Sequence, residues 1–247
     1  MIDNVFPVGD SPSVKVGIRS GRVRVEAGEP GVVRIQVDTR DPTFEVSRRG
    51  DALLASGERG GRADVTVHAP SMIDVDVSTA SADVEVLTPV RRLEVASASG
   101  DMAFDTATRL QTKSASGTVR GNGVEGEARC ITASGDIRIG VIGDRADLST
   151  ASGDVVIEQC HGELSVASLS GDIRVGRHTG PDLNAKSVSG GVRIGIPPRT
   201  RLDIDARTLS GKVSLPPSPA PSTEPPEREM SVKVRLVSGN LRIDRVD

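Results

Sequence analysis

Aromatic residues are almost absent from this chain of 247 residues, which has no Trp, no Tyr and three Phe, at positions 6, 44 and 104. An ordinary globular core obtains much of its buried area from aromatic side chains. A narrow core has little room for them and fills instead with Val, Ile, Leu and Ala. The same scarcity removes the stacking surfaces with which proteins hold single-stranded nucleic acids or sugars.

Neither sign of charge predominates, because 31 basic and 34 acidic residues are interspersed and the net charge is −3. The chain therefore has no basic stripe of the kind that nucleic-acid binding needs. No apolar run approaches the length of a membrane span. The first residues, Met1 to Phe6, lack the positive region and the apolar segment of a signal peptide. We expect a cytoplasmic protein, unless another route exports it, with no nucleic-acid partner and no membrane insertion.

Cysteine and histidine are also scarce, with Cys130 and Cys160 and three His, at positions 68, 161 and 178. Both cysteines fall at apolar positions of a repeat described below, so we expect small buried hydrophobes rather than a disulfide or a metal site. His161 follows Cys160 but should point to the other side of the strand. A serine nucleophile needs a histidine base oriented by an acid, and the three His form no repeated constellation. We predict no catalytic residue, no cofactor and no metal.

The chain does have a repeated motif, Ser-Gly-Asp, which recurs about every eighteen residues. Full copies lie at 99–101, 134–136, 152–154 and 170–172, and altered copies lie at 81–83, 116–118, 189–191, 210–212 and 238–240. A fixed short period indicates structural units that bury their apolar sides by stacking on neighbours.

Apolar and polar residues alternate on both sides of each repeated Gly. Ile137, Arg138 and Ile139 follow one Gly, and similar triplets precede each Gly by five to seven residues. Period-2 alternation is typical of a half-buried strand. Each repeat therefore predicts strand, corner, strand and turn, which is one coil of a parallel β-solenoid of about eighteen residues. The alternative is an antiparallel sandwich of two-strand hairpins, which evenly spaced strands would also suggest.

The ends of the chain depart from the period. We expect an antiparallel N-terminal β cap over residues 1–72, the regular β-solenoid over 73–195, and irregular C-terminal repeats over 196–247 that form a second β cap and carry a Pro-rich loop at 216–227. Strand-like segments of the first cap lie at 13–18, 21–26, 31–38, 43–47, 51–55 and 62–69. Two capped ends would argue against a self-polymerising filament, though not against a dimer.

Three columns of the repeat are candidates for structure or function. The corner Gly column should permit a positive φ and close stacking; it contains Gly100, Gly117, Gly135, Gly153, Gly171 and Gly190. The Asp column should either bind a cation such as Ca²⁺ or be satisfied locally by backbone amides and Arg; it contains Asp83, Asp101, Asp136, Asp154 and Asp172. The outward Arg column is the expected interaction face; it contains Arg120, Arg138, Arg174 and Arg193.

The string Ser-Ala-Ser-Gly-Asp at 97–101, followed by alternating apolar residues, resembles a bacterial family of unknown function labelled "putative adhesin". The resemblance extends over about residues 70 to 243 and includes the irregular amino-terminal strands. It implies a right-handed β-solenoid without known catalytic residues.

The sequence as a whole predicts a non-enzymatic scaffold or adhesin-like binding module for an unknown protein or envelope component, as a monomer or small homo-oligomer. The alternative is a self-assembling structural β-helix of the cytoskeletal type. A carbohydrate-active enzyme is a third reading, which the short loops and the missing acidic or basic catalytic clusters disfavour.

Overall fold

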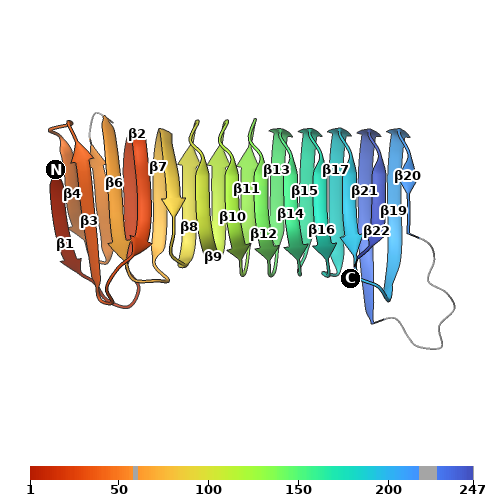
Figure 1. Ribbon diagram of the computed structural model, residues 1–247, viewed down its shortest axis with the longest axis horizontal. Helices are drawn as coiled ribbons and strands as arrows, with labels where there is room; N and C mark the ends of the chain where they lie inside the picture. The colour runs from red at the N-terminus through yellow and green to blue at the C-terminus, as the bar shows by residue number, and fades with distance from the viewer. Residues whose placement is uncertain (58–60, 217–226, 247) are drawn as a thin grey trace. The chain divides into compact units, whose positions relative to one another are not determined.

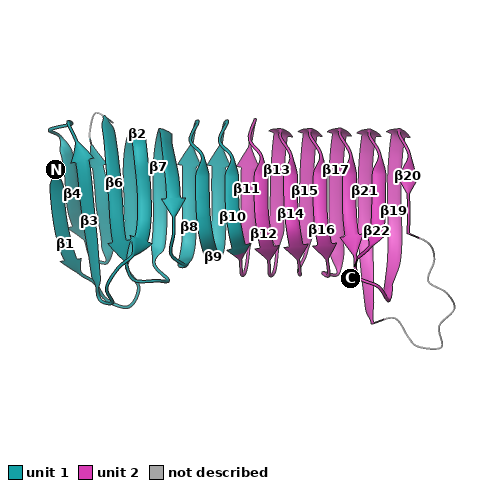
Figure 2. Ribbon diagram, in the orientation of Figure 1, with its two compact units in different colours: residues 1–123 teal, residues 124–247 magenta. Residues whose placement is uncertain are grey.

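The computed structural model describes residues 1–57, 61–216 and 227–246, and it contains β-strands and no helix within them (Figure 1). The chain divides into two compact units, residues 1–123 and 124–247 (Figure 2). The described residues hold no helix that could cross a lipid bilayer.

Unit 1 contains ten strands, of which the last ends on the first residue of unit 2: β1 (Ile2–Pro7), β2 (Ser13–Ala27), β3 (Val32–Thr39), β4 (Phe44–Arg49), β5 (Ala52–Gly57), β6 (Arg62–Ala69), β7 (Asp74–Val86), β8 (Val90–Ser97), β9 (Met102–Ser114) and β10 (Val119–Val124). Unit 2 contains β11 (Ala128–Thr132), β12 (Ile137–Ile142), β13 (Ala146–Ser152), β14 (Val155–Cys160), β15 (Leu164–Ser170), β16 (Ile173–His178), β17 (Asp182–Ser189), β18 (Val192–Ile196), β19 (Thr200–Ser210), β20 (Val213–Ser214), β21 (Arg228–Ser238) and β22 (Leu241–Arg245).

Strands of unit 2 stack in two parallel ladders. In the first ladder β11, β13, β15 and β17 are neighbours, and Ala128 lies beside Ala146. In the second ladder β12, β14, β16 and β18 are neighbours, so that Ile137, Val155 and Ile173 lie side by side. One strand of each ladder, such as β13 followed by β14, makes one coil. Parallel pairing excludes the antiparallel sandwich and confirms the predicted β-solenoid.

The interior of unit 2 is filled by the inward columns of both ladders. Leu148 of the first ladder and Ile157 of the second are fully buried, as alternation predicts. Val and Ile dominate because β-branched side chains pack well on a pleated surface. Cys130 and Cys160 are buried in these columns, as their apolar positions in the repeat predict.

One pair of exceptions in the columns of unit 1 is complementary. Phe104 is the largest side chain of its column, and Gly121 occupies the same position one coil later. A Cβ at Gly121 would lie 1.9 Å from Cζ of the Phe104 ring. The ring therefore fills the space that the glycine leaves, and a narrow core accommodates one aromatic residue by omitting the next side chain.

The amino-terminal strands form as expected, but their pairing is mixed. β1 pairs with β3, β3 with β6 and β4 with β5, all antiparallel. The segments 13–18 and 21–26 form one long strand, β2, which pairs in parallel with β5, β6 and β7. The expectation of a wholly antiparallel meander is therefore wrong for β2. Val14 lies beside Val75 although 61 positions separate them, and no short period in the sequence signals this pairing.

The last two coils of unit 2 exchange places relative to the sequence. β21 pairs with β17 on one side and with β19 on the other, and β22 likewise lies between β18 and β20. The order of strands in the first ladder is therefore β17, β21, β19 (Figure 1). The boundaries at residues 72 and 195 stay predictions, and residues 217–226 of the expected Pro-rich loop lie outside the described residues.

Candidate functional site

The predicted corner glycines stack so closely that a side chain has no room. A Cβ on Gly171 would lie 2.0 Å from the carbonyl oxygen of Gly153, and one on Gly190 would lie 2.2 Å from that of Gly171. In unit 1, a Cβ on Gly117 would similarly lie 1.9 Å from the carbonyl oxygen of Gly100. Gly171 and Gly190 also have positive φ, of 153° and 145°. Gly135 belongs to this file as well, since its carbonyl oxygen lies 2.3 Å from a Cβ built on Gly153. Close backbone approach is thus the common reason for glycine here, and positive φ adds to it at some corners.

The carboxylates of the Asp column are used to hold adjacent coils together. In unit 2 the amide of Asp154 donates to Oδ1 of Asp136 at 2.9 Å, and the amide of Asp172 donates to Oδ1 of Asp154 at 2.9 Å. In unit 1 the amide of Asp101 donates to Oδ1 of Asp83 at 3.1 Å. Each carboxylate offsets its repulsion with its neighbours by accepting a backbone proton. The geometry favours satisfaction of these carboxylates by backbone amides over a cation site. Within the described ranges, no group of three or more His, Cys, Asp or Glu could hold a metal ion.

Three of the four predicted Arg residues share one outward column on the second ladder of unit 2. Arg138 lies beside Val156, which lies beside Arg174, and Arg174 lies beside Arg193. The column continues to Arg242, beside Arg193 on β22. The fourth predicted residue, Arg120, is exposed on β10 in unit 1.

Two of these guanidinium groups are held by the acid that lies two residues earlier in the chain, just before the strand begins. Arg138 donates from Nη2 to Oδ2 of Asp136 at 2.7 Å, and Arg174 donates from Nη2 to Oδ2 of Asp172 at 2.9 Å. Arg193 has no hydrogen bond or ion pair within the described part of the chain. Its charge is therefore the one in this column that a partner could neutralise without breaking an existing contact.

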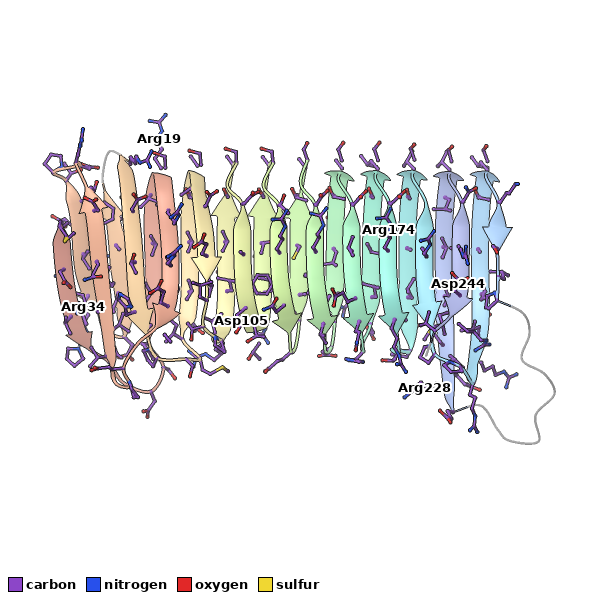
Figure 3. The ribbon with its side chains drawn as sticks, in the orientation of Figure 1. Arg19, Arg34, Asp105, Arg174, Arg228 and Asp244 are labelled. Carbon is purple, nitrogen blue, oxygen red and sulfur yellow. The ribbon has the colours of Figure 1, made fainter. Side chains whose placement is uncertain are left out.

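Beside the Arg column lies a shallow groove of about 340 Å³. Two glycines lie along it at corresponding positions, Gly176 on β16 and Gly195 on β18, and their backbones approach so closely that a Cβ on Gly195 would lie 1.8 Å from the carbonyl oxygen of Gly176. The groove is lined by Val156, Ile157, Glu158, Arg174, Val175, Gly176, Arg193, Gly195, Asp244 and Val246. Arg174 and Asp244, both labelled in Figure 3, contribute charges of opposite sign to it.

The groove combines a basic side, apolar walls and an acid. Arg174 and Arg193 supply the positive charge, and Val156 and Val246 supply apolar surface. Asp244 accepts hydrogen bonds from Nε of Arg242, so its charge is already engaged. Such a site can hold a narrow segment that presents a carboxylate, because guanidinium groups favour carboxylate partners.

Sequence reasoning missed the groove and the residues that form it. Gly176 and Gly195 stand at outward positions five residues after a corner Gly, where β14 has Glu158 and β22 has Asp244. This column of two glycines between two acidic residues was visible in the sequence. Its position beside the Arg column follows only once the final coil is known to lie next to β18.

The remaining ionisable groups do not form a reactive site among the described residues. Nδ1 of His161 lies 2.8 Å from Oγ1 of Thr179, with no acid recorded on the other ring nitrogen. His178 lies beside Cys160 in the interior, and neither of its ring nitrogens has a partner in hydrogen-bonding geometry. Burial lowers the pKa of His178 to about 4 and raises the pKa of Cys160 to about 11. Both groups are therefore neutral at pH 7, which suits packing rather than catalysis.

In comparisons with known proteins, one family model and several solved structures of low sequence identity match this chain. The model of the family described as Toastrack DUF4097 matches residues 32–244. A "putative adhesin" from Parabacteroides distasonis ATCC 8503 is 11% identical, with 99% of this chain and 96% of that chain covered and a TM-score of 0.40. A "putative adhesin" from Bacteroides fragilis NCTC 9343 is 13% identical, with 99% of this chain and 96% of that chain covered and a TM-score of 0.42. A "putative lipid binding protein" from Parabacteroides distasonis ATCC 8503 is 12% identical, with 100% of this chain and 96% of that chain covered and a TM-score of 0.48. No curated protein matches the chain.

Proposed function

This chain belongs to the Toastrack DUF4097 family, and we propose that it is a non-enzymatic β-solenoid binding module whose second ladder in unit 2 receives a protein or envelope partner. The family and the all-β fold are compatible with many activities, since fold does not imply function. The argument for binding therefore depends on the groove and the Arg column beside it.

The single observation that carries the proposal is the unpaired Arg193 at the edge of the groove. Arg174 beside it is oriented by Asp172, and a partly fixed guanidinium loses less conformational freedom on binding than a free one. A partner carboxylate between the two would satisfy Arg193 and share Arg174. The positive end of the site therefore favours an acidic group.

The shape of the groove suggests an extended segment rather than a compact ligand. Gly176 and Gly195 contribute only backbone to its lining, and Val156 and Val246 offer apolar contact. A narrow segment can lie over backbone where no side chain rises. We infer that the partner presents a carboxylate followed or preceded by a small apolar side chain.

The described lining of the groove lacks the components of a catalytic site. The groove contains no Ser, Thr, Cys or His, so it holds neither a nucleophile nor a histidine base. Its acids, Glu158 and Asp244, share the site with Arg174 and Arg193 rather than forming an isolated pair of carboxylates. These features favour recognition over turnover.

A pull-down from the native host with the wild type and two variants as baits tests the proposal. Wild-type protein, Arg193→Glu and Arg129→Glu are compared as bait; Arg129 is the matched control, because it is exposed on β11 in the same unit but in the other ladder. We expect a partner retained by the wild type and by the control, and lost from the Arg193 variant. A synthetic peptide taken from that partner should then bind with at least about tenfold lower affinity to the variant, since one charged pair is worth over 1 kcal/mol at such a site.

Two results would overturn the proposal. A partner retained equally by all three baits would remove the support for this face. Degradation of a polysaccharide in a substrate screen, abolished by a substitution in the groove, would show that the module is an enzyme.

A further inference from the structure

The outermost coil of unit 2 leaves one edge of each ladder without a neighbour. β19 pairs with β21 and β20 pairs with β22, and within the described ranges neither has a strand on its other side (Figure 2). An unpaired strand edge presents rows of free N–H and C=O groups that can pair with another chain. β19 has 11 residues, which is long for such an edge.

The inward residues of this coil are apolar and more exposed than their counterparts one coil inward. Met230, Val232 and Val234 on β21 are buried, whereas Leu202 and Ile204 beside them on β19 are only half-buried. On the remainder of the coil, apolar residues are exposed in larger measure: Leu209 is 86% exposed, Val213 43% and Leu215 48%. An exposed apolar edge of this kind marks an interaction surface.

We propose that β19 pairs antiparallel with β19 of a second copy of this chain, so that the ends of two unit 2 solenoids form a two-fold symmetric dimer. The contact is isologous, with the same strand used by both copies. It would supply the missing neighbour to both β19 edges and cover the apolar residues of the outermost coils. An isologous contact uses up the edge on each copy, so assembly stops at two chains.

The outward charges on β19 select one alignment of the two strands. Antiparallel pairing places residues of the same face opposite each other. A two-fold axis at Ile204 would set Arg opposite Arg and Asp opposite Asp. An axis at Asp203 would set Asp205 opposite Arg201 of the other copy, but it would also set the Asp203 carboxylate against its own copy. Asp203 has no cation bound to it among the described residues, so that repulsion would not be compensated.

An axis at Asp205 also gives two complementary pairs, and it differs in that the like charges on the axis are compensated within each copy. Asp203 of each copy then lies opposite Arg207 of the other, and the inward Ile204 lies opposite Ala206. The two Asp205 carboxylates also face each other, but each is already held by Arg235 and lies 3.4 Å from Nε of Arg207. The hydrogen bond from Arg235 holds the pKa of Asp205 below its usual range, which reflects this compensation. Opposite charges therefore meet on either side of the axis, and the like charges on the axis are compensated within each copy.

A charge-swap series on the full-length protein tests the alignment. Wild type, Asp203→Arg, Arg207→Asp and the double variant are compared by sedimentation velocity and light scattering over a range of concentrations. Each single variant places like charges opposite each other twice, whereas the double variant restores two opposite-charge pairs. Arg129→Asp, on exposed β11, controls for the change in net charge, and circular dichroism with thermal melting controls for folding.

We expect the wild type and the control to form a dimer, each single variant to dimerise at least about tenfold more weakly, and the double variant to return to within about threefold of the wild type. A wild type that stays monomeric at every concentration would overturn the proposal. Single variants that dimerise as well as the wild type, or a double variant that is not restored, would overturn it too. Growth of assemblies beyond two chains would refute the closed contact.

Discussion

Placing a carboxylate at two successive positions of β14 should have opposite consequences for stability. Val155 is 0% exposed, between Ile137 and Ile173 in the inward column. Val156 is half-buried on the outward face, between Arg138 and Arg174. Val155→Asp and Val156→Asp therefore make the same chemical change in two environments that differ in burial and in the charge of their neighbours.

The expected cost at the inward position is large. Val155→Asp removes about 1.5–3 kcal/mol of apolar burial. It also leaves a carboxyl group without a partner among aliphatic side chains, which costs several kcal/mol whether the group stays charged or takes up a proton. A total loss of about 5 kcal/mol would consume a large share of the 5–15 kcal/mol by which proteins are usually stable. In a chain of this size it would lower the melting temperature by roughly 10 °C or more.

The outward position should tolerate the same substitution. Val156→Asp gains two flanking guanidinium groups, each worth about 0.2–1 kcal/mol across a strand pair, and loses a similar amount of apolar contact. We expect its free energy of unfolding to stay within about 1 kcal/mol of the wild type. Val156→Lys sharpens the comparison, because it meets the same two Arg with the opposite sign and should be less stable than the Asp variant.

Urea unfolding monitored by circular dichroism gives the three free energies. The difference between Val156→Asp and Val156→Lys should shrink at high salt, since exposed charges are screened. Equal destabilisation by Val155→Asp and Val156→Asp would refute the assignment of faces. Equal stability of the two Val156 variants at low salt would refute the Arg column as an electrostatic feature.

Three further outcomes follow from the packing. Burial lowers the pKa of His178 from 6.5 to about 4, so the folded state favours the neutral form. The free energy of unfolding should therefore fall by up to about 3 kcal/mol as the pH drops from 6.5 to about 4. Urea titrations at several pH values should show that His178→Leu flattens this dependence. Gly171→Ala should cost at least about 2 kcal/mol in the same assay because its Cβ would meet the preceding corner's carbonyl oxygen, whereas Gly9→Ala, with nothing within 4 Å, should be silent. Gly121→Val should cost roughly 1–3 kcal/mol by collision with the Phe104 ring, and a double-mutant cycle with Phe104→Leu should recover part of that loss, while strictly additive effects would contradict the contact.

The regular coils could be predicted from sequence because their information is local. Inward and outward positions alternate within each strand, so burial at Ile137, Leu148 and Ile157 follows from the pattern alone. The corner file of glycines likewise follows from the period. These features repeat, and each copy strengthens the interpretation of the others.

The order of the last coils was not predicted because the spacing of the repeats does not encode it. Ile204 and Val232 are chemically equivalent neighbours for Leu183, and the spacing of corner glycines says nothing about which of them takes that place. The fuller apolar column of β21, compared with Ala206 on β19, is the signal that was available: a strand covered on both sides gains more from large side chains. The groove was missed for the same reason, since Asp244 reaches it only through this order.

The exchange of the last two coils has a consequence for how the chain is made. Residues 200–215 leave the ribosome before residues 228–245, yet the later segment occupies the place directly against β17 and β18. The strands β21 and β22 therefore take a place between two coils that were synthesised before them. This end of unit 2 is complete only after β21 and β22 have been synthesised, and a chain that stops short of residue 228 would leave β17 without β21 as its neighbour.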